Sequence, residues 1–252
     1  SKNYKQTSVR YFFFNPIRII YYIESLLVKR YESFCFKKFT KILLHSKVEM
    51  DSVEKKFKRK LAQFSFGVTN INKKYSFHQK NYKIIFIGNI KYAPNKKACY
   101  EFANKILPLI NEIYPNIEFH IIGEISKIDK FLLKKKTNVK ILGKIKNLDP
   151  YLDKTICGMA NLKIATGIQT KLLTYMSYGI PSVCSQQVFE SFDAIKESKI
   201  NFYKNNEEMI KIILKLKRNK NFSLSASKRA LQTIKKFKWD KIIFPTLNKI
   251  LN

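Results

Sequence analysis

Residues 165 to 185 read Ala165-Thr-Gly-Ile-Gln-Thr-Lys-Leu-Leu-Thr-Tyr-Met-Ser-Tyr-Gly-Ile-Pro-Ser-Val-Cys-Ser185. The pattern predicts a turn at Gly167, then a helix that stops at Gly179, then a short strand at 182–184. A helix that begins after a tight loop presents free backbone N–H groups, which suit an anion. Lys171 adds a positive charge in the first turn of that helix. The stretch therefore predicts a phosphate or diphosphate site.

On both sides of this stretch, short apolar runs alternate with helical segments. Three of the expected strands end at a glycine, namely Gly88, Gly123 and Gly143. Alternating strands and helices are typical of a doubly wound parallel sheet of the α/β class, which binds ligands at the carboxyl ends of its strands. The expected strands are 83–87, 117–122, 139–142, 162–165, 182–184 and 201–203, and the expected helices are 95–113, 148–154, 206–218, 224–237 and 239–251.

The first 82 residues differ in character from the rest of the chain. They predict a helix over 17–36, a strand over 41–45, a charged helix over 48–60 and a strand over 62–66. Residues 69–82 are polar and aperiodic, which is typical of a linker. We therefore expect two units, an incomplete N-terminal domain with linker at 1–82 and a second domain at 83–252.

The charge balance is extreme, because 49 Lys and Arg face 18 Asp and Glu and give a formal net charge of +31. Such a balance indicates polyanionic partners such as nucleic acid, anionic lipid or a phosphorylated substrate. Compositional bias from an AT-rich genome is the alternative, because the lysines are spread along the whole chain. No motif for reading grooves or stacking bases accompanies the charge, so specific nucleic-acid binding is not expected.

Several other functions lack the residues that they need. The four cysteines and three histidines are isolated from one another, so no metal site is expected, and free cysteines fit a reducing cytoplasm. There is no G-x-G-x-x-G or P-loop motif. Residues 11–28 are apolar but carry Pro16, Arg18 and Glu24, so they are too interrupted to span a membrane. Basic residues follow them, so this stretch either lies on an anionic membrane surface or packs on a domain outside the chain.

The order of these pieces resembles the C-terminal half of family 4 glycosyltransferases, the glycosyl transferases group 1 domain of GT-B fold. The most specific match is the run 167–183, which is similar to that family's Gly-x-Gln-x-Lys and Gly-x-Pro-Val motifs. The segments 86–95, 119–123, 139–145 and 148–152 match in the same order. Residues before the linker resemble the tail of the family's N-terminal domain, and the first half or more of that domain is not expected in the chain.

The resemblance implies that the second domain binds a nucleoside diphosphate sugar as donor substrate, with no metal and no other cofactor. It gives Lys171 the catalytic role of neutralising the leaving diphosphate. The other implied donor-binding residues are Gly88, Asn89, Lys91, Asn95, Gly123, Gly143, Lys144, Ile145, Thr166, Gly167, Ile168, Gln169, Thr170 and Thr174. Within this set, Gly143, Lys144 and Ile145 are expected to face the base.

The chain departs from the family pattern at three positions. Thr166 and Thr174 stand where the family often has glutamates for the donor sugar and the ribose, and Asn89 stands where arginine is common. Neutral hydroxyls bind a ligand more weakly than charged groups do. The implied function is transfer of a sugar to a glycan or lipid-linked acceptor in surface polysaccharide synthesis, in the cytoplasm or at the inner face of the membrane. The alternatives are a non-catalytic scaffold at a membrane and a basic nucleic-acid-binding protein.

Overall fold

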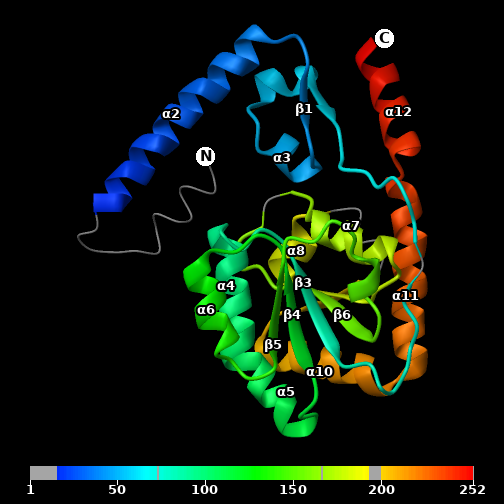
Figure 1. The fold of residues 1–252 in the computed structure, drawn as a ribbon. Helices are drawn as coiled ribbons and strands as arrows, with labels where there is room; N and C mark the ends of the chain where they lie inside the picture. The colour runs from blue at the N-terminus through cyan, green and yellow to red at the C-terminus, as the bar shows by residue number, and fades with distance from the viewer. Residues whose placement is uncertain (1–15, 73, 166, 193–199, 252) are drawn as a thin grey trace.

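The computed structural model describes residues 16–72, 74–165, 167–192 and 200–251 (Figure 1). The chain begins there with the long helix α2 (Pro16–Lys38). A small parallel sheet follows, in which β1 (Ile42–Leu44) pairs with β2 (Leu61–Gln63). Between these strands lie α3 (Lys47–Asp51) and the 3-10 segment η1 (Lys55–Lys60).

The single charged helix expected over 48–60 is wrong, because α3 and η1 are separate segments. Ser46 caps the start of α3, and its side chain and that of Glu49 form a reciprocal capping box. The hydroxyl of Ser52 donates to the carbonyl of Glu49 and helps to end the helix after one turn. Phe57, buried in η1, stacks on Phe36 of α2 and gives the second segment its own anchor.

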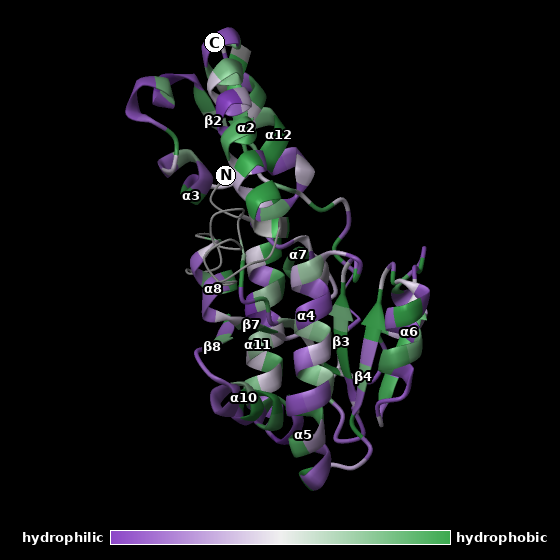
Figure 2. Ribbon diagram, turned by 90° about the vertical axis from the view of Figure 1, so that its left-hand side faces the viewer, coloured by the Kyte–Doolittle hydropathy of each residue, from purple (hydrophilic) through white to green (hydrophobic). Residues whose placement is uncertain are grey.

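The second sheet has six parallel strands in the order β5-β4-β3-β6-β7-β8. This confirms the doubly wound α/β fold, since the strand order reverses direction at β3. The strands are β3 (Lys83–Ile87), β4 (Glu118–Ile122), β5 (Val139–Gly143), β6 (Thr155–Ala160), β7 (Ser182–Ser185) and β8 (Asn201–Tyr203). The upper ends of β3 and β4 are strongly hydrophobic (Figure 2).

The strand that precedes the 165–185 stretch lies earlier than the sequence suggested. Residues 162–165 form no strand, whereas β6 (Thr155–Ala160) pairs with both β3 and β7. All six residues of β6 are buried at the centre of the sheet. A strand buried on both faces shows no alternation of polar and apolar residues, and β6 carries its glycine, Gly158, inside the strand rather than at its end.

The helices cover both faces of this sheet. The first forms one continuous rod of α4 (Ala93–Glu101), a wider π turn η2 (Phe102–Ile106) and α5 (Leu107–Ile113). Among the others, α6 packs on β5, α10 on β6 and β7, and α11 on α7. Their bounds are α6 (Lys127–Lys134), η3 (Asp149–Tyr151), α7 (Thr170–Ser177), α8 (Gln186–Glu190), α10 (Asn206–Arg218), α11 (Lys220–Ile234), η4 (Lys235–Phe237) and α12 (Trp239–Leu251).

The last helix, α12, follows α11 and η4 and returns to the small sheet, where it contacts β2 (Figure 1). The indole of Trp239 packs so closely on Gly67 that a Cβ there would lie 2.6 Å from the ring. Val68 forms a parallel bridge with Lys238, and the hydroxyl of Thr246 donates to the carbonyl of Gln63 at 3.3 Å. No described residue between β2 and β3 lies in a helix or strand, so the linker over 69–82 agrees with the described part of the chain. The division at residue 82 stays a prediction.

Candidate donor site at the strand ends

The glycines that end β3, β4 and β5 lie side by side at one edge of the sheet. The N–H of Gly88 donates to the carbonyl of Ile122 at 2.9 Å, and the N–H of Gly123 donates to the carbonyl of Gly143 at 2.8 Å. Gly123 has φ +139, and a Cβ there would lie 1.9 Å from the carbonyl oxygen of Gly88. Only glycine allows this approach of the two backbones. The three strand ends therefore form a small-residue edge that a ligand can approach closely.

Helix α7 is fixed over this edge by Tyr175. Its ring packs on Gly158 in β6, where a Cβ would lie 2.4 Å from the ring. Its hydroxyl accepts the N–H of Ile87 at 2.9 Å and donates to the carbonyl of Met159 at 3.1 Å. Tyr175 thus connects α7 to both central strands, which sets the position of the first turn of α7 and of Lys171.

Lys171 is the buried cation of the site. Its side chain is 7% exposed, and its Nζ donates to Oδ1 of Asn95 at 2.8 Å. The ammonium also lies 4.6 Å from the centre of the Phe86 ring. Asn95 itself is held by its Nδ2, which donates to the carbonyl of Asn89 at 2.8 Å. The β3–α4 loop and the first turn of α7 therefore meet through one hydrogen-bonded chain of Lys171, Asn95 and Asn89.

Burial lowers the pKa of the Lys171 ammonium to about 8. The Cys99 thiol also lies near the ammonium, but burial raises its pKa and keeps it neutral. The amide, the ring and the thiol are therefore neutral groups, and none is the charge partner that a buried ammonium normally has. No carboxylate in the described ranges forms an ion pair with it at 4 Å or less. An anion bound beside the ammonium would supply the missing charge, so the geometry favours an anionic ligand at the start of α7.

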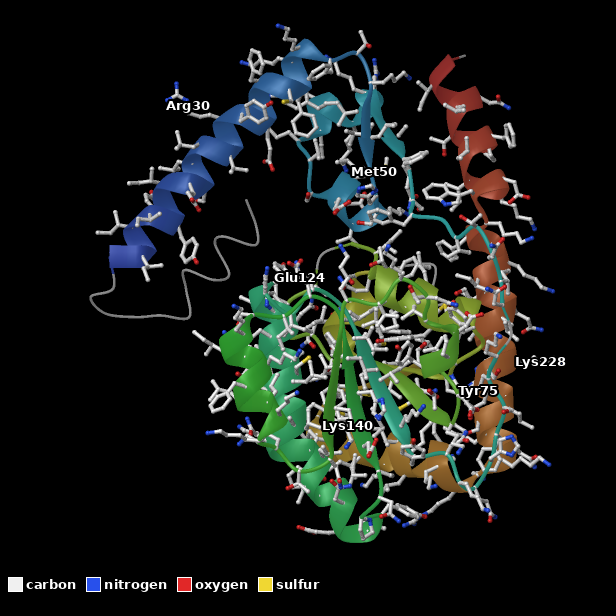
Figure 3. The ribbon with its side chains drawn as sticks, viewed as in Figure 1. Arg30, Met50, Tyr75, Glu124, Lys140 and Lys228 are labelled. Atoms are coloured by element: carbon white, nitrogen blue, oxygen red, sulfur yellow. The ribbon has the colours of Figure 1, made fainter. Side chains whose placement is uncertain are left out.

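Lys91 and Asn89 are exposed residues of the same loop. The Nζ of Lys91 lies 2.6 Å from Oε1 of Glu124, and its backbone N–H donates to Oδ1 of Asn89 at 3.0 Å. Glu124 lies at the end of the sheet that faces α3, whose Met50 is labelled in Figure 3. Lys91 therefore has a carboxylate partner already, and its charge is less available to a ligand than that of Lys171.

The remaining site residues surround the loop before α7. Gly167 has φ +67, Ile168 is buried, and Gln169 precedes α7 without a side-chain cap. Thr170 is exposed, and Thr174 donates its hydroxyl to the carbonyl of Thr170 at 3.1 Å. Thr166 lies outside the described residues. After β5, Lys144 is exposed and Ile145 is half-buried.

A carboxylate from the N-terminal segment also reaches this loop, which the sequence reasoning missed. A Cβ at Gly167 would lie 2.9 Å from Oε1 of Glu49 in α3. The other oxygen, Oε2, accepts the N–H groups of His45 and Ser46, each at 3.0 Å. The Ser-x-x-Glu capping box was readable in the sequence, but its proximity to Gly167 depends on how the small sheet sits over the large one.

Two further observations concern the described part of the chain. No three His, Cys, Asp or Glu side chains in it are grouped so that they could hold a metal ion. No helix in the same ranges has the length and apolar character needed to cross a membrane.

The comparison with known families decides the family. The model described as "Glycosyl transferases group 1" matches residues 81–219, which include β3 to α10 and every site residue described above except those of the N-terminal segment. The chain belongs to this family. The match begins within the linker and confirms the resemblance seen in the motifs. No curated protein matches the chain at a significant level.

Solved structures confirm that the fold of this family member is GT-B. TarM of S. aureus, in a complex described as containing fondaparinux, α-GlcNAc-glycerol and UDP, matches with a TM-score of 0.69 at 18% identity over 87% of this chain and 45% of that one. HepE of Anabaena, in complex with UDP and glucose, matches with a TM-score of 0.67 at 10% identity. The match covers 87% of this chain and 64% of HepE. Sucrose-phosphate synthase of Thermosynechococcus elongatus matches with a TM-score of 0.69 at 11% identity. The match covers 94% of this chain and 62% of the synthase. The chain thus spans 45% to 64% of the length of these three proteins.

Proposed function

We propose that the protein is a glycosyltransferase that uses a nucleoside diphosphate sugar, and that the diphosphate binds at the first turn of α7. One observation carries this proposal. The ammonium of Lys171 is buried at the strand-end edge, in the first turn of α7, with Asn95 as its hydrogen-bond acceptor, and no described side chain caps that turn. Helix N-termini and cations are the groups that proteins use for phosphates.

The proposed chemistry is the transfer of a sugar from the diphosphate to an acceptor hydroxyl. The bond between the anomeric carbon and the diphosphate oxygen breaks, and a bond to the acceptor oxygen forms. Negative charge increases on the leaving diphosphate as its bond breaks. A fixed ammonium and oriented N–H groups stabilise that charge without reorganising during the reaction. Lys171 would therefore act as an electrostatic catalyst in contact with the leaving group.

The other proposed donor contacts are those that the family resemblance implies. Backbone groups at Gly143 and Ile145 would face the base, and Asn89 would approach from the β3 side. The hydroxyl of Thr174 would meet the ribose in place of a carboxylate. Neutral contacts of this kind favour weaker donor binding than charged ones.

A glycan or lipid-linked acceptor at an anionic membrane surface is the finer part of the proposal. Helix α2 supports it, because apolar side chains on it are exposed to solvent, among them Ile19 (64%), Ile23 (50%) and Leu27 (58%). Lys29 and Arg30 follow directly, and Lys37 and Lys38 end the helix. A helix that combines exposed apolar bulk with cations is suited to the interface of an anionic bilayer. This would place catalysis at the cytoplasmic face.

The test is calorimetric titration of the protein with UDP, GDP and their glucose and N-acetylglucosamine conjugates. We expect one nucleoside diphosphate to bind with a dissociation constant below a millimolar. Absence of binding by all of them would contradict the donor site.

A non-catalytic relative remains the second candidate, because Thr174 supplies a neutral hydroxyl where a charge is common in the family. A non-catalytic protein would bind the nucleoside diphosphate but would not hydrolyse the nucleoside diphosphate sugar, even slowly. Assaying release of free sugar from the conjugate over hours separates the two, since an active site built for transfer also passes the sugar to water at a low rate.

A further inference from the structure

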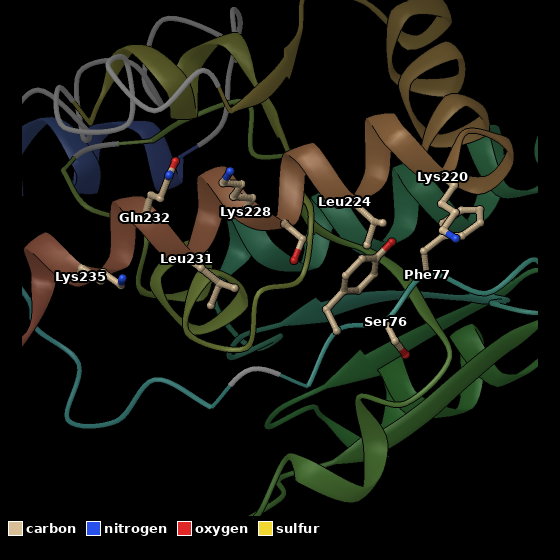
Figure 4. A pocket seen from close by; sticks show the side chains of 10 residues that line it. Ser76, Phe77, Lys220, Leu224, Lys228, Leu231, Gln232 and Lys235 are labelled. Carbon is tan, nitrogen blue, oxygen red and sulfur yellow. The ribbon is translucent and has the colours of Figure 1, made fainter.

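A second hollow in the molecule lies away from the strand ends, between the linker and α11 (Figure 4). It is an open groove with a volume of about 630 Å³. None of the side chains that line it belongs to the candidate donor site. Aromatic and aliphatic groups form much of its surface, with lysines along one side and the polar Ser76, Ser227 and Gln232 between them.

The linker wall of the groove is held firmly in place. The N–H of Tyr75, whose side chain is 6% exposed, donates to the carbonyl of Tyr178 at 3.1 Å. The amide of Asn81 donates to the carbonyl of Ser76 at 2.9 Å, and Lys217 of α10 donates to the carbonyl of Asn81 at 2.6 Å. Because these hydrogen bonds hold the linker wall at both ends, the groove is already formed, and a ligand does not bear the entropic cost of ordering it.

The helix wall presents a row of cations. Lys220 and Lys228 of α11 and Lys235 at the start of η4 line the groove, with Leu224 and Leu231 between them. Because a helix rises 1.5 Å per residue, the backbone positions of successive lysines in this row are about 10 to 12 Å apart along the axis. No ion pair or side-chain hydrogen bond involves these three ammonium groups among the described residues, and no acidic residue lines the groove.

We propose that this groove binds a linear anionic polysaccharide. A chain with an acidic group on about every second sugar would meet successive lysines. The ring faces of its sugars would pack on Phe77 and Leu224, and its hydroxyls would bond to serine and glutamine. The proposal is independent of the donor site, and it would give the protein a place to hold a charged glycan outside the reaction centre.

The shape and charge density of the groove argue against other polyanions. A flat membrane surface does not enter a concave groove. Nucleic acids carry a phosphate at every few ångströms and bind proteins through dense cations and stacked bases. Three lysine positions spaced about 10 to 12 Å along the helix axis match a more sparsely charged chain.

The test compares two triple variants that lower the net charge equally. The groove variant is Lys220→Gln/Lys228→Gln/Lys235→Gln, and the control is Lys127→Gln/Lys130→Gln/Lys134→Gln at exposed positions of α6. The probe is a hyaluronan pentasaccharide, in which every second sugar carries one carboxylate, titrated by calorimetry at low and at physiological salt. Thermal melting verifies that both variants fold. We expect the groove variant to bind at least tenfold more weakly than the wild type, and the control to change by less than twofold.

A single variant separates a glycan from any other polyanion. Phe77→Ser should weaken binding of the pentasaccharide several-fold and leave binding of linear inorganic polyphosphate unchanged, because polyphosphate has no sugar face to stack. Equal losses of pentasaccharide affinity in the two triple variants would overturn the proposal, because binding would then come from positive charge spread over the whole surface. Loss of oligonucleotide or anionic vesicle binding in the groove variant, with pentasaccharide binding retained, would overturn it as well.

Discussion

The ammonium of Lys171 lies 2.8 Å from Oδ1 of Asn95, although 76 residues separate the two in the chain. This hydrogen bond joins the start of α7 to the start of α4 across the central strands. It keeps a buried positive charge at the strand-end edge with a neutral partner. A neutral partner leaves the charge of the lysine available to an anionic ligand, whereas a carboxylate would already have compensated it.

Replacement of Lys171 should weaken diphosphate binding strongly. We expect Lys171→Met to cost about 1.5–3 kcal/mol, or about 10- to 150-fold in affinity, as for a hydrogen bond to a charged group. Calorimetry with the nucleoside diphosphate that the wild type binds gives the measurement. Lys211→Met, at an exposed position of α10, is the matched control and should change the affinity little. Equal affinity in both variants would place the phosphate elsewhere.

Diphosphate affinity should fall as the pH rises above about 8. Burial lowers the pKa of Lys171 to about 8 in the free protein, so the side chain is neutral at higher pH. A bound diphosphate favours the charged form and raises that pKa, so binding takes up a proton in this range. Titrations in two buffers of different ionisation enthalpy measure the uptake. It should vanish in Lys171→Met, and uptake that persists there would assign it to another group.

The amide of Asn95 should be needed as a neutral partner. In Asn95→Asp a carboxylate would pair with Lys171, raise its pKa and repel the diphosphate. We expect weaker binding and a pH dependence that moves to higher pH. Asn104→Asp, on the exposed side of the same helical rod, is the control for charge alone. If diphosphate binding has the same pH profile in Asn95→Asp and the wild type, Lys171 is not the group whose protonation sets that profile.

Two glycines at strand ends should differ in their tolerance of a side chain. Gly143 has φ +74 and open space around it, so Gly143→Ala should cost about 1–2 kcal/mol from backbone conformation alone. Gly123→Ala adds a clash with the carbonyl of Gly88, and we expect a loss larger than about 3 kcal/mol. Urea denaturation measures both. Similar losses in the two variants would mean that the strand ends separate easily.

Exposed apolar residues of α2 should govern binding to anionic vesicles. We expect Ile19→Ser/Ile23→Ser to remove most vesicle binding at low salt, because this pair would lose the apolar surface that enters the interface. The matched control is Leu109→Ser/Ile113→Ser on α5, where exposure is 45% and 47%. Flotation of the protein with vesicles measures the bound fraction. If both double variants retain vesicle binding equally, the binding comes from positive charge spread over the whole surface and not from α2.

The local sequence determined the strands with an apolar run and a terminal glycine, and it determined the loop and helix of residues 167–179. In these stretches, short-range rules on turns, glycine conformation and helix starts decide the structure. The central strand β6 escaped prediction because a strand buried on both faces has no alternating pattern, and its Gly158 serves the Tyr175 ring rather than a turn. The division of 48–60 into two segments escaped it for a similar reason, since the stacking of Phe57 on Phe36 is a contact with a distant helix.

For the candidate site, the sequence by itself determined which residues follow the strand ends and that Lys171 begins a helix. Only the tertiary structure decided that Lys171 is buried against Asn95, that Lys91 is already paired with Glu124, and that Glu49 reaches Gly167. These relations join segments separated by tens of residues. Their distances depend on how the sheets and helices pack, and packing depends on the volumes of all the side chains together. A lysine on a surface and a lysine in a buried crevice have the same local sequence signal, and the fold alone distinguishes them.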